Sequence, residues 1–203
     1  MLRQILLLAP ALAAGLTLAA AAEPLAPIED SLRPDDVERL SQRDAIVGRN
    51  LLGAFAEGAP EDVQIVVEGL SGPALPAAEA AAVMEGDWSC RVVKLGGILS
   101  LTAYAPFRCR IGANGSFEKL TGSQRMIGQI GLRGDQMVYA GTGFIAGDTP
   151  PPYAELPAEV DPSANPQRVP EVGVVEFASA DKGRMILPLP YLESDLNLLL
   201  LSR

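Results

Sequence analysis

The residues best suited to chemistry gather between positions 86 and 125. This stretch contains the only tryptophan, Trp88, and both cysteines, Cys90 and Cys109. Paired cysteines can form a disulfide, bind a metal or supply a catalytic thiolate. Arginine and lysine side chains in the same stretch could bind a carboxylate or a phosphate. The compartment in which the chain works decides between these chemistries, and the N-terminal residues indicate it.

The N-terminus has the pattern of a secretory signal peptide. Arg3 supplies a positive charge, residues 5–22 are apolar, and Ala20-Ala21-Ala22 offers a cleavage site. We expect residues 1–22 to be removed on export; an uncleaved membrane anchor is the alternative. The remaining chain has no second apolar segment of membrane-spanning length, so we expect a soluble product without a stable membrane span.

Export places Cys90 and Cys109 in an oxidising compartment, which favours a structural disulfide between them. A bridge over about 20 residues stabilises a fold by roughly 3 kcal/mol through the unfolded state. The chain has no histidine, so a zinc site would depend on carboxylates, and Ser-His-Asp or Cys-His catalysis is excluded. We therefore expect no catalytic residue, no metal and no cofactor.

The formal net charge of −9 argues against a nucleic-acid partner, because such binding needs clustered lysine and arginine. The charge is uneven, however: residues 87–133 hold seven basic side chains and two acidic ones. This basic segment could pair with acidic groups of its own domain, which we favour, or form a patch that binds an anion. The candidate binding residues are Arg91, Arg108, Arg110, Lys119, Ser123 and Arg125.

Strand alternation separates these side chains into two faces. If Cys90 and Cys109 are bridged, the faces that carry them must meet, because bridged Cα atoms lie within about 7 Å. Arg91, Arg108 and Arg110 then point to the opposite face. Residues 119–125 form the most polar strand-and-turn segment, which is either a plain turn or the mouth of a pocket.

The elements that must position these residues begin with a helical region at residues 23–85. Apolar side chains recur at helical spacing in residues 31–55, which predicts one helix with a single buried stripe; the stripe is Val37, Leu40, Val47, Leu51 and Phe55. Shorter helices are predicted at residues 61–70 and in the alanine-rich stretch that ends at Met84. We expect a helical hairpin that covers the core of its own domain.

From Gly86 onward the period changes to that of strands. Hairpin signals such as Asn114-Gly115 separate most of them, and a proline-rich loop at residues 147–170 interrupts the series. Strands are predicted at residues 88–92, 98–104, 107–111, 116–120, 125–132, 136–145, 172–177, 184–189 and 196–201. The pattern predicts an α+β fold in which helices precede an antiparallel barrel or sandwich of about eight strands; we favour the barrel, which forms one compact domain with the helices.

Two resemblances extend this interpretation. Gly86-Asp87-Trp88 resembles the G-x-W motif on the first strand of lipocalins. In that family the tryptophan closes the base of the barrel, and a basic residue late in the chain packs on its ring. The resemblance implies a structural role for Trp88 and assigns the basic partner to Arg203, since a cation over an indole is favourable.

A second resemblance spans nearly the whole chain after the signal peptide. Its motifs are Gly86-Asp-Trp-Ser-Cys-Arg91, Lys94-Leu-Gly-Gly97, Phe107-Arg-Cys-Arg-Ile111 and Lys119-Leu-Thr-Gly-Ser-Gln-Arg125. In order and spacing they resemble an exported proteobacterial family catalogued as a domain of unknown function. The resemblance implies a periplasmic protein of a Gram-negative bacterium. It carries over no activity and no catalytic residues.

Three functions remain open from the sequence. The first is a non-enzymatic periplasmic protein with a lipocalin-like barrel that binds a small molecule or an envelope protein. The second is a structural envelope protein whose barrel is filled, and an empty, partly apolar cavity would argue against it. The third is a carboxylate-dependent hydrolase, which needs two acidic side chains in one cleft with raised pKa values.

Overall fold

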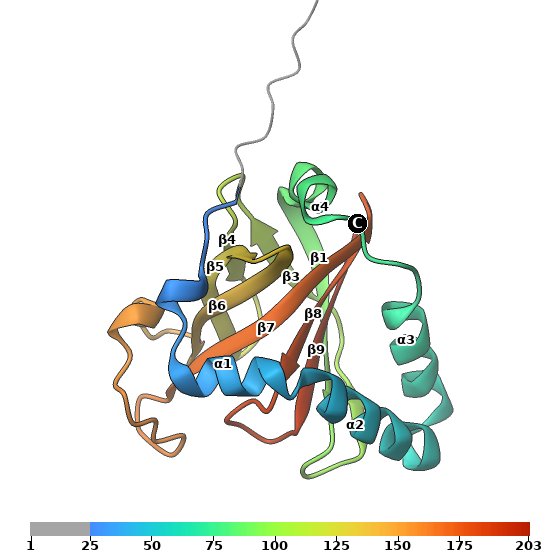
Figure 1. Cartoon of the computed structure of the whole chain (residues 1–203). Coiled ribbons are helices and arrows are strands. Elements are labelled where there is room, and N and C mark those ends of the chain that lie inside the picture. Colours follow the sequence, from blue (N-terminus) through green and yellow to red (C-terminus); the bar gives the residue numbers. More distant parts are fainter. Residues whose placement is uncertain (1–24) are drawn as a thin grey trace, which may run out of the picture.

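The computed structural model describes residues 25–203, and the expected signal peptide at residues 1–22 lies outside them (Figure 1). Nine strands form one antiparallel sheet in the order β2-β1-β3-β4-β5-β6-β7-β8-β9, and β1 also pairs with β9. That pairing closes a barrel of eight strands, and the short β2 pairs with the C-terminal end of β1 in line with β3, so the predicted fold class is confirmed. The strands are β1 (Gly86–Leu95), β2 (Leu101–Ala103), β3 (Phe107–Ile111), β4 (Ser116–Lys119), β5 (Gln124–Arg133), β6 (Gln136–Ile145), β7 (Arg168–Ser179), β8 (Lys182–Pro188) and β9 (Leu196–Ser202).

The predicted disulfide is present between β1 and β3. Trp88 is the cross-strand partner of Cys109, and the Cα atoms of Cys90 and Cys109 are 5.9 Å apart. Both cysteines are buried with Trp88 inside the barrel, whereas Asp87 and Ser89 are exposed on its outer face. Alternation along β1 therefore separates the faces as predicted.

One end of the barrel is packed shut by aromatic side chains. The rings of Trp88 and Phe177 are 5.4 Å apart, and those of Phe117 and Tyr139 are 5.3 Å apart. Helix α4 (Ala77–Met84) packs against this core, and the indole nitrogen of Trp88 donates a 2.8 Å hydrogen bond to its last carbonyl. This end is the base of the barrel.

Arg203 covers the base from outside. Its guanidinium carbon lies 3.8 Å from the centroid of the Trp88 ring, and Nη2 donates hydrogen bonds to the carbonyls of Val83 (2.7 Å) and Glu85 (2.9 Å). The C-terminal residue thus holds the end of α4 against the indole, in the arrangement that the lipocalin resemblance implied.

Replacing Arg203 by glutamine should lower the free energy of unfolding by about 1 kcal/mol, because the cation–π contact is lost. Water should then reach the indole, so the fluorescence of Trp88 should shift to longer wavelength. Urea denaturation followed by tryptophan emission measures both effects. Arg108→Gln, at an exposed position of β3, is the control and should leave both unchanged; identical behaviour of the two variants would contradict the assignment.

The N-terminal region forms η1 (Glu29–Ser31), α1 (Pro34–Ser41), α2 (Arg43–Glu57), α3 (Pro60–Leu70) and α4. The single helix predicted at residues 31–55 is wrong, because the chain breaks at Gln42. Leu40 of α1 packs with the outer residues of β6 and β7, whereas Ile46 and Ala54 of α2 pack with β1 and β9. A straight helix could not follow the curved wall to both clusters. Phe55 of the predicted stripe is 51% exposed.

No helix in residues 25–203 combines the length and apolarity needed to cross a bilayer.

The proline-rich loop is fastened to α1 along its first half. Tyr153, in η2 (Tyr153–Glu155), donates to a carboxylate oxygen of Asp36. Arg33 donates to the carbonyls of Pro157 and Ala158 at 2.9 and 2.7 Å. The loop is shorter than predicted because β7 begins at Arg168, so its last predicted residues belong to the barrel wall.

Candidate functional site

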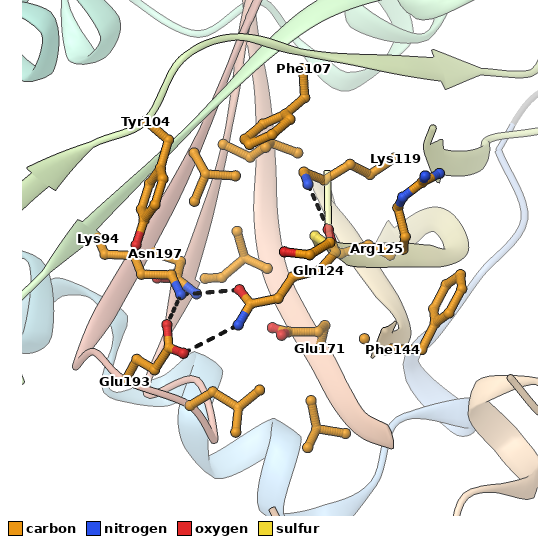
Figure 2. A pocket seen from close by; sticks show the side chains of 18 of the residues that line it. Lys94, Tyr104, Phe107, Lys119, Gln124, Arg125, Phe144, Glu171, Glu193 and Asn197 are labelled. Carbon is orange, nitrogen blue, oxygen red and sulfur yellow. Dashed lines mark hydrogen bonds and ion pairs between the residues drawn. The ribbon is translucent and has the colours of Figure 1, made fainter. Parts of the chain in front are cut away.

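A cavity of about 300 Å³ opens at the end of the barrel opposite the base (Figure 2). Its walls come from the C-terminal ends of β1, β4, β6 and β8 and the N-terminal ends of β3, β5, β7 and β9, which are the ends farthest from Trp88. Apolar side chains that include Val92, Met126, Leu187 and Leu199 line it together with polar ones. The polar lining comprises Lys94, Lys119, Ser123, Gln124, Arg125, Gln167, Glu171, Glu193 and Asn197.

Two glycines on the inner face of β6 make room at the inner end of the cavity. A Cβ atom at Gly141 would collide with the Tyr139 hydroxyl, and one at Gly143 would lie 3.0 Å from Cγ of Glu171. The Tyr139 hydroxyl is fully buried and has no hydrogen-bond partner in the described residues. The missing side chains therefore let a tyrosine and a glutamate occupy the barrel interior.

Glu171 is the least expected member of this site. It is the cross-strand partner of Gly141, it is 8% exposed, and it lines the cavity. Within residues 25–203 no group donates a hydrogen bond to its carboxyl, and Oε2 is wholly buried. Burial raises the pKa of this carboxyl to about 7, although the charges of Arg39 and Lys94 act in the opposite direction. An unpaired buried carboxyl in a cavity is a strong indication of a functional site.

Three polar side chains contact one another at the mouth of the cavity. Lys94 pairs with the carboxylate of Glu193 and donates a 3.1 Å hydrogen bond to Oε1 of Gln124, whose amide donates to Glu193 at 3.3 Å. Figure 2 shows the resulting triangle. Glu193 has a φ of 66°, which is strained for a residue with a side chain. Its backbone carbonyl accepts a 3.3 Å hydrogen bond from Ile98, so the loops after β1 and β8 are joined.

Lys119 and Arg125 line the cavity but also hold the turn between β4 and β5. Nζ of Lys119 lies 3.8 Å from the centroid of the Phe107 ring and donates to the carbonyls of Thr121 and Gln124 at 3.0 and 2.6 Å. Arg125 donates to the carbonyls of Leu120 and Gly122. Burial, and then the charges of Arg125 and Lys94, lower the pKa of Lys119 to about 8.

The structure divides the predicted binding residues into two groups. Lys119, Ser123 and Arg125 line the cavity. Arg108 and Arg110 are exposed on the outer face of β3, where Arg110 pairs with Asp87 at 2.6 Å. Arg91 lines a separate, shallow groove along α3. None of these three arginines therefore lines the cavity. Arg110 instead pairs with an acidic side chain of its own domain, which is the interpretation favoured from the sequence.

Sequence reasoning missed Lys94, Glu171 and Glu193 as members of one site. Glu171 carried a usable signal, because Val169, Glu171, Gly173 and Val175 alternate and share the inner face of β7. The predicted loop ended at Pro170 and the predicted strand began at Val172, so the glutamate was assigned to neither. No group of three or more His, Cys, Asp or Glu side chains that could hold a metal ion occurs in the described part of the chain.

Comparisons with known proteins place the chain in a family. No curated protein and no solved structure matches it. The family model described as "Domain of unknown function (DUF4893)" matches residues 29–201, a span that runs from η1 into the last strand of the barrel. Because this match covers most of the chain, the protein belongs to the DUF4893 family.

Proposed function

We propose that the protein is a non-enzymatic periplasmic binding protein that holds one small molecule inside its barrel. The cavity of about 300 Å³ is the observation that carries this proposal, because it lies within the usual size range of small-molecule sites. Its walls are partly apolar, and one unpaired carboxyl lies at its inner end. The proposal includes export with removal of residues 1–22, and a single compact domain formed by residues 23–85 and 86–203.

The other two functions have less support. A structural protein with a filled barrel would not need the open space above the packed base. A carboxylate-dependent hydrolase would need a second acid free to act beside Glu171. The other acidic side chain of the cavity, Glu193, is paired with Lys94, so it neutralises a lysine at the mouth.

Filling the cavity should abolish binding. Met126 lines the cavity on β5, and its neighbour Ile127 lies on the outer face and is 42% exposed. Met126→Trp should reduce the fraction of protein that carries a bound molecule at least tenfold, because the indole occupies the ligand's space. Ile127→Trp adds the same ring outside the barrel and should leave that fraction unchanged.

Native mass spectrometry of protein purified from the periplasm measures the bound fraction. A wild-type protein that carries a defined small molecule, lost in Met126→Trp and kept in Ile127→Trp, supports the proposal. A bare wild-type monomer, or equal occupancy in the two variants, would sink it.

A further inference from the structure

We infer that the molecule held in the barrel is uncharged and carries a hydroxyl group that forms a hydrogen bond with the carboxyl group of Glu171. This inference rests on the proposed binding function and names the chemical class of the ligand. The apolar walls around Val92, Leu187 and Leu199 suit an apolar body attached to that hydroxyl group.

The charged groups of the cavity already have partners, with one exception. Lys94 pairs with Glu193, while Lys119 and Arg125 donate to backbone carbonyls of their own turn. Among the described residues, Glu171 is the charged side chain of the lining that has no hydrogen-bond partner. A buried polar group without a hydrogen-bond partner destabilises the fold. A ligand that forms a hydrogen bond with Glu171 removes that cost, and this contributes to its affinity.

The charges around Glu171 restrict the charge that a ligand can carry. Arg39 and Lys94 act electrostatically on the Glu171 carboxyl, so an ammonium group placed against that carboxyl would be repelled by two cations that are already there. Glu171 has its pKa raised to about 7 by burial, and a carboxylate placed against it would add like-charge repulsion. The cavity therefore disfavours both signs of charge, which selects a neutral polar group.

A hydroxyl group suits Glu171 better than other neutral groups do. A pKa of about 7 means that Glu171 is present in both its protonated and ionised forms near neutral pH. A hydroxyl group can donate to the carboxylate and can accept from the protonated carboxyl group. An ether or ketone only accepts, so it fits the protonated form alone. An amide donates through its nitrogen and accepts through its oxygen, so it would have to turn over when the carboxyl changes form, whereas a hydroxyl group uses one oxygen for both.

A matched series of probes tests the inference, because its members share one apolar body. The probes are 4-propylphenol, its methyl ether 4-propylanisole, the cation 4-propylbenzylammonium and the anion 4-propylbenzoate, each titrated calorimetrically at pH 7. We expect the phenol to bind at least tenfold more tightly than the other three. In Glu171→Leu the phenol and the ether should bind with nearly equal affinity. Glu118→Leu, on the exposed face of β4, is the matched control and should keep the full preference.

Each outcome decides something. Tightest binding of the ammonium or the benzoate, equal binding of phenol and ether to the wild-type protein, or a preference that survives in Glu171→Leu would overturn the inference. Where such binding is still lost in Met126→Trp, the barrel remains a binding site and only the ligand class is wrong. If no probe binds and the purified protein carries no molecule, the proposed function fails as well. A co-purified molecule without a hydroxyl group also overturns the inference.

Discussion

Replacing Cys90 and Cys109 together by alanine should lower the free energy of unfolding by about 3 kcal/mol. The bridge joins residues 19 positions apart, so it restricts the unfolded chain over the segment that contains β2 and the turn before β3. Both sulfur atoms are also buried beside Trp88 in the core at the base of the barrel, so their removal costs packing as well. The two contributions have the same sign.

Urea denaturation under non-reducing conditions measures this change. The control is Asp87→Asn, which breaks the ion pair with Arg110 on the exposed face of the same two strands and should change stability far less. Mass spectrometry after non-reducing alkylation should find no free thiol in the wild-type protein. A double-alanine variant as stable as Asp87→Asn would refute a stabilising role for the bridge.

The regions where the sequence predicted the fold well are those with strong local signals. The predicted bounds of β3 and β6 match the structure, because Pro106, Asn114-Gly115 and Gly134 limit where pairing can begin or end. The break between α1 and α2 has no such signal, since neither glycine nor proline marks Gln42. It follows from the curvature of the barrel, which local spacing does not report. The strand predicted at residues 98–104 is also shorter in the structure because of a contact that is distant in sequence. Ile98 and Leu99 are exposed in a turn, and the backbone N–H of Ile98 donates to the carbonyl of Glu193.

The site was harder to predict than the fold because its pairs are distant in sequence. Alternation placed Arg108 and Arg110 opposite the cysteines, yet it could not show that the cavity lies on the cysteine side. For the polar segment at residues 119–125 the sequence favoured a plain turn, with a pocket mouth as the alternative. In the structure Lys119 and Arg125 hold this turn and also line the cavity. Lys94 and Glu193 are 99 residues apart, and only the closure of β1 against β9 brings them together.

Glu171→Gln should remove most of the pH dependence of stability between pH 4.5 and pH 8. The carboxyl has a pKa of about 7 in the folded protein, against an ordinary value of 4.5. Well below pH 4.5 the group is protonated in both states and makes no pH-dependent contribution to stability. As the pH rises from 4.5 to 7, the unfolded chain releases its proton while the folded protein keeps it, so folding becomes less favourable by about 3 kcal/mol in total. Glutamine has the same shape and no proton to release.

The surroundings of Glu171 set this difference and also limit what else can contribute. The charged and titratable groups near it are Arg39 and Asp36 from α1, Lys94 from β1 and Tyr139 from β6. Lys119, whose pKa is about 8, changes the stability above this window, and it does so equally in both proteins. The difference between wild type and Glu171→Gln therefore isolates the one carboxyl.

Urea denaturation at half-unit steps of pH measures the effect in protein freed of bound ligand. The wild-type curve should fall below that of Glu171→Gln by a margin that grows from pH 4.5 and levels off above pH 7. Glu118→Gln on the outer face of β4 should follow the wild type throughout. Parallel curves for wild type and Glu171→Gln would mean that the carboxyl is hydrated or paired in solution. The cavity would then lack the unpaired group on which its proposed selectivity depends.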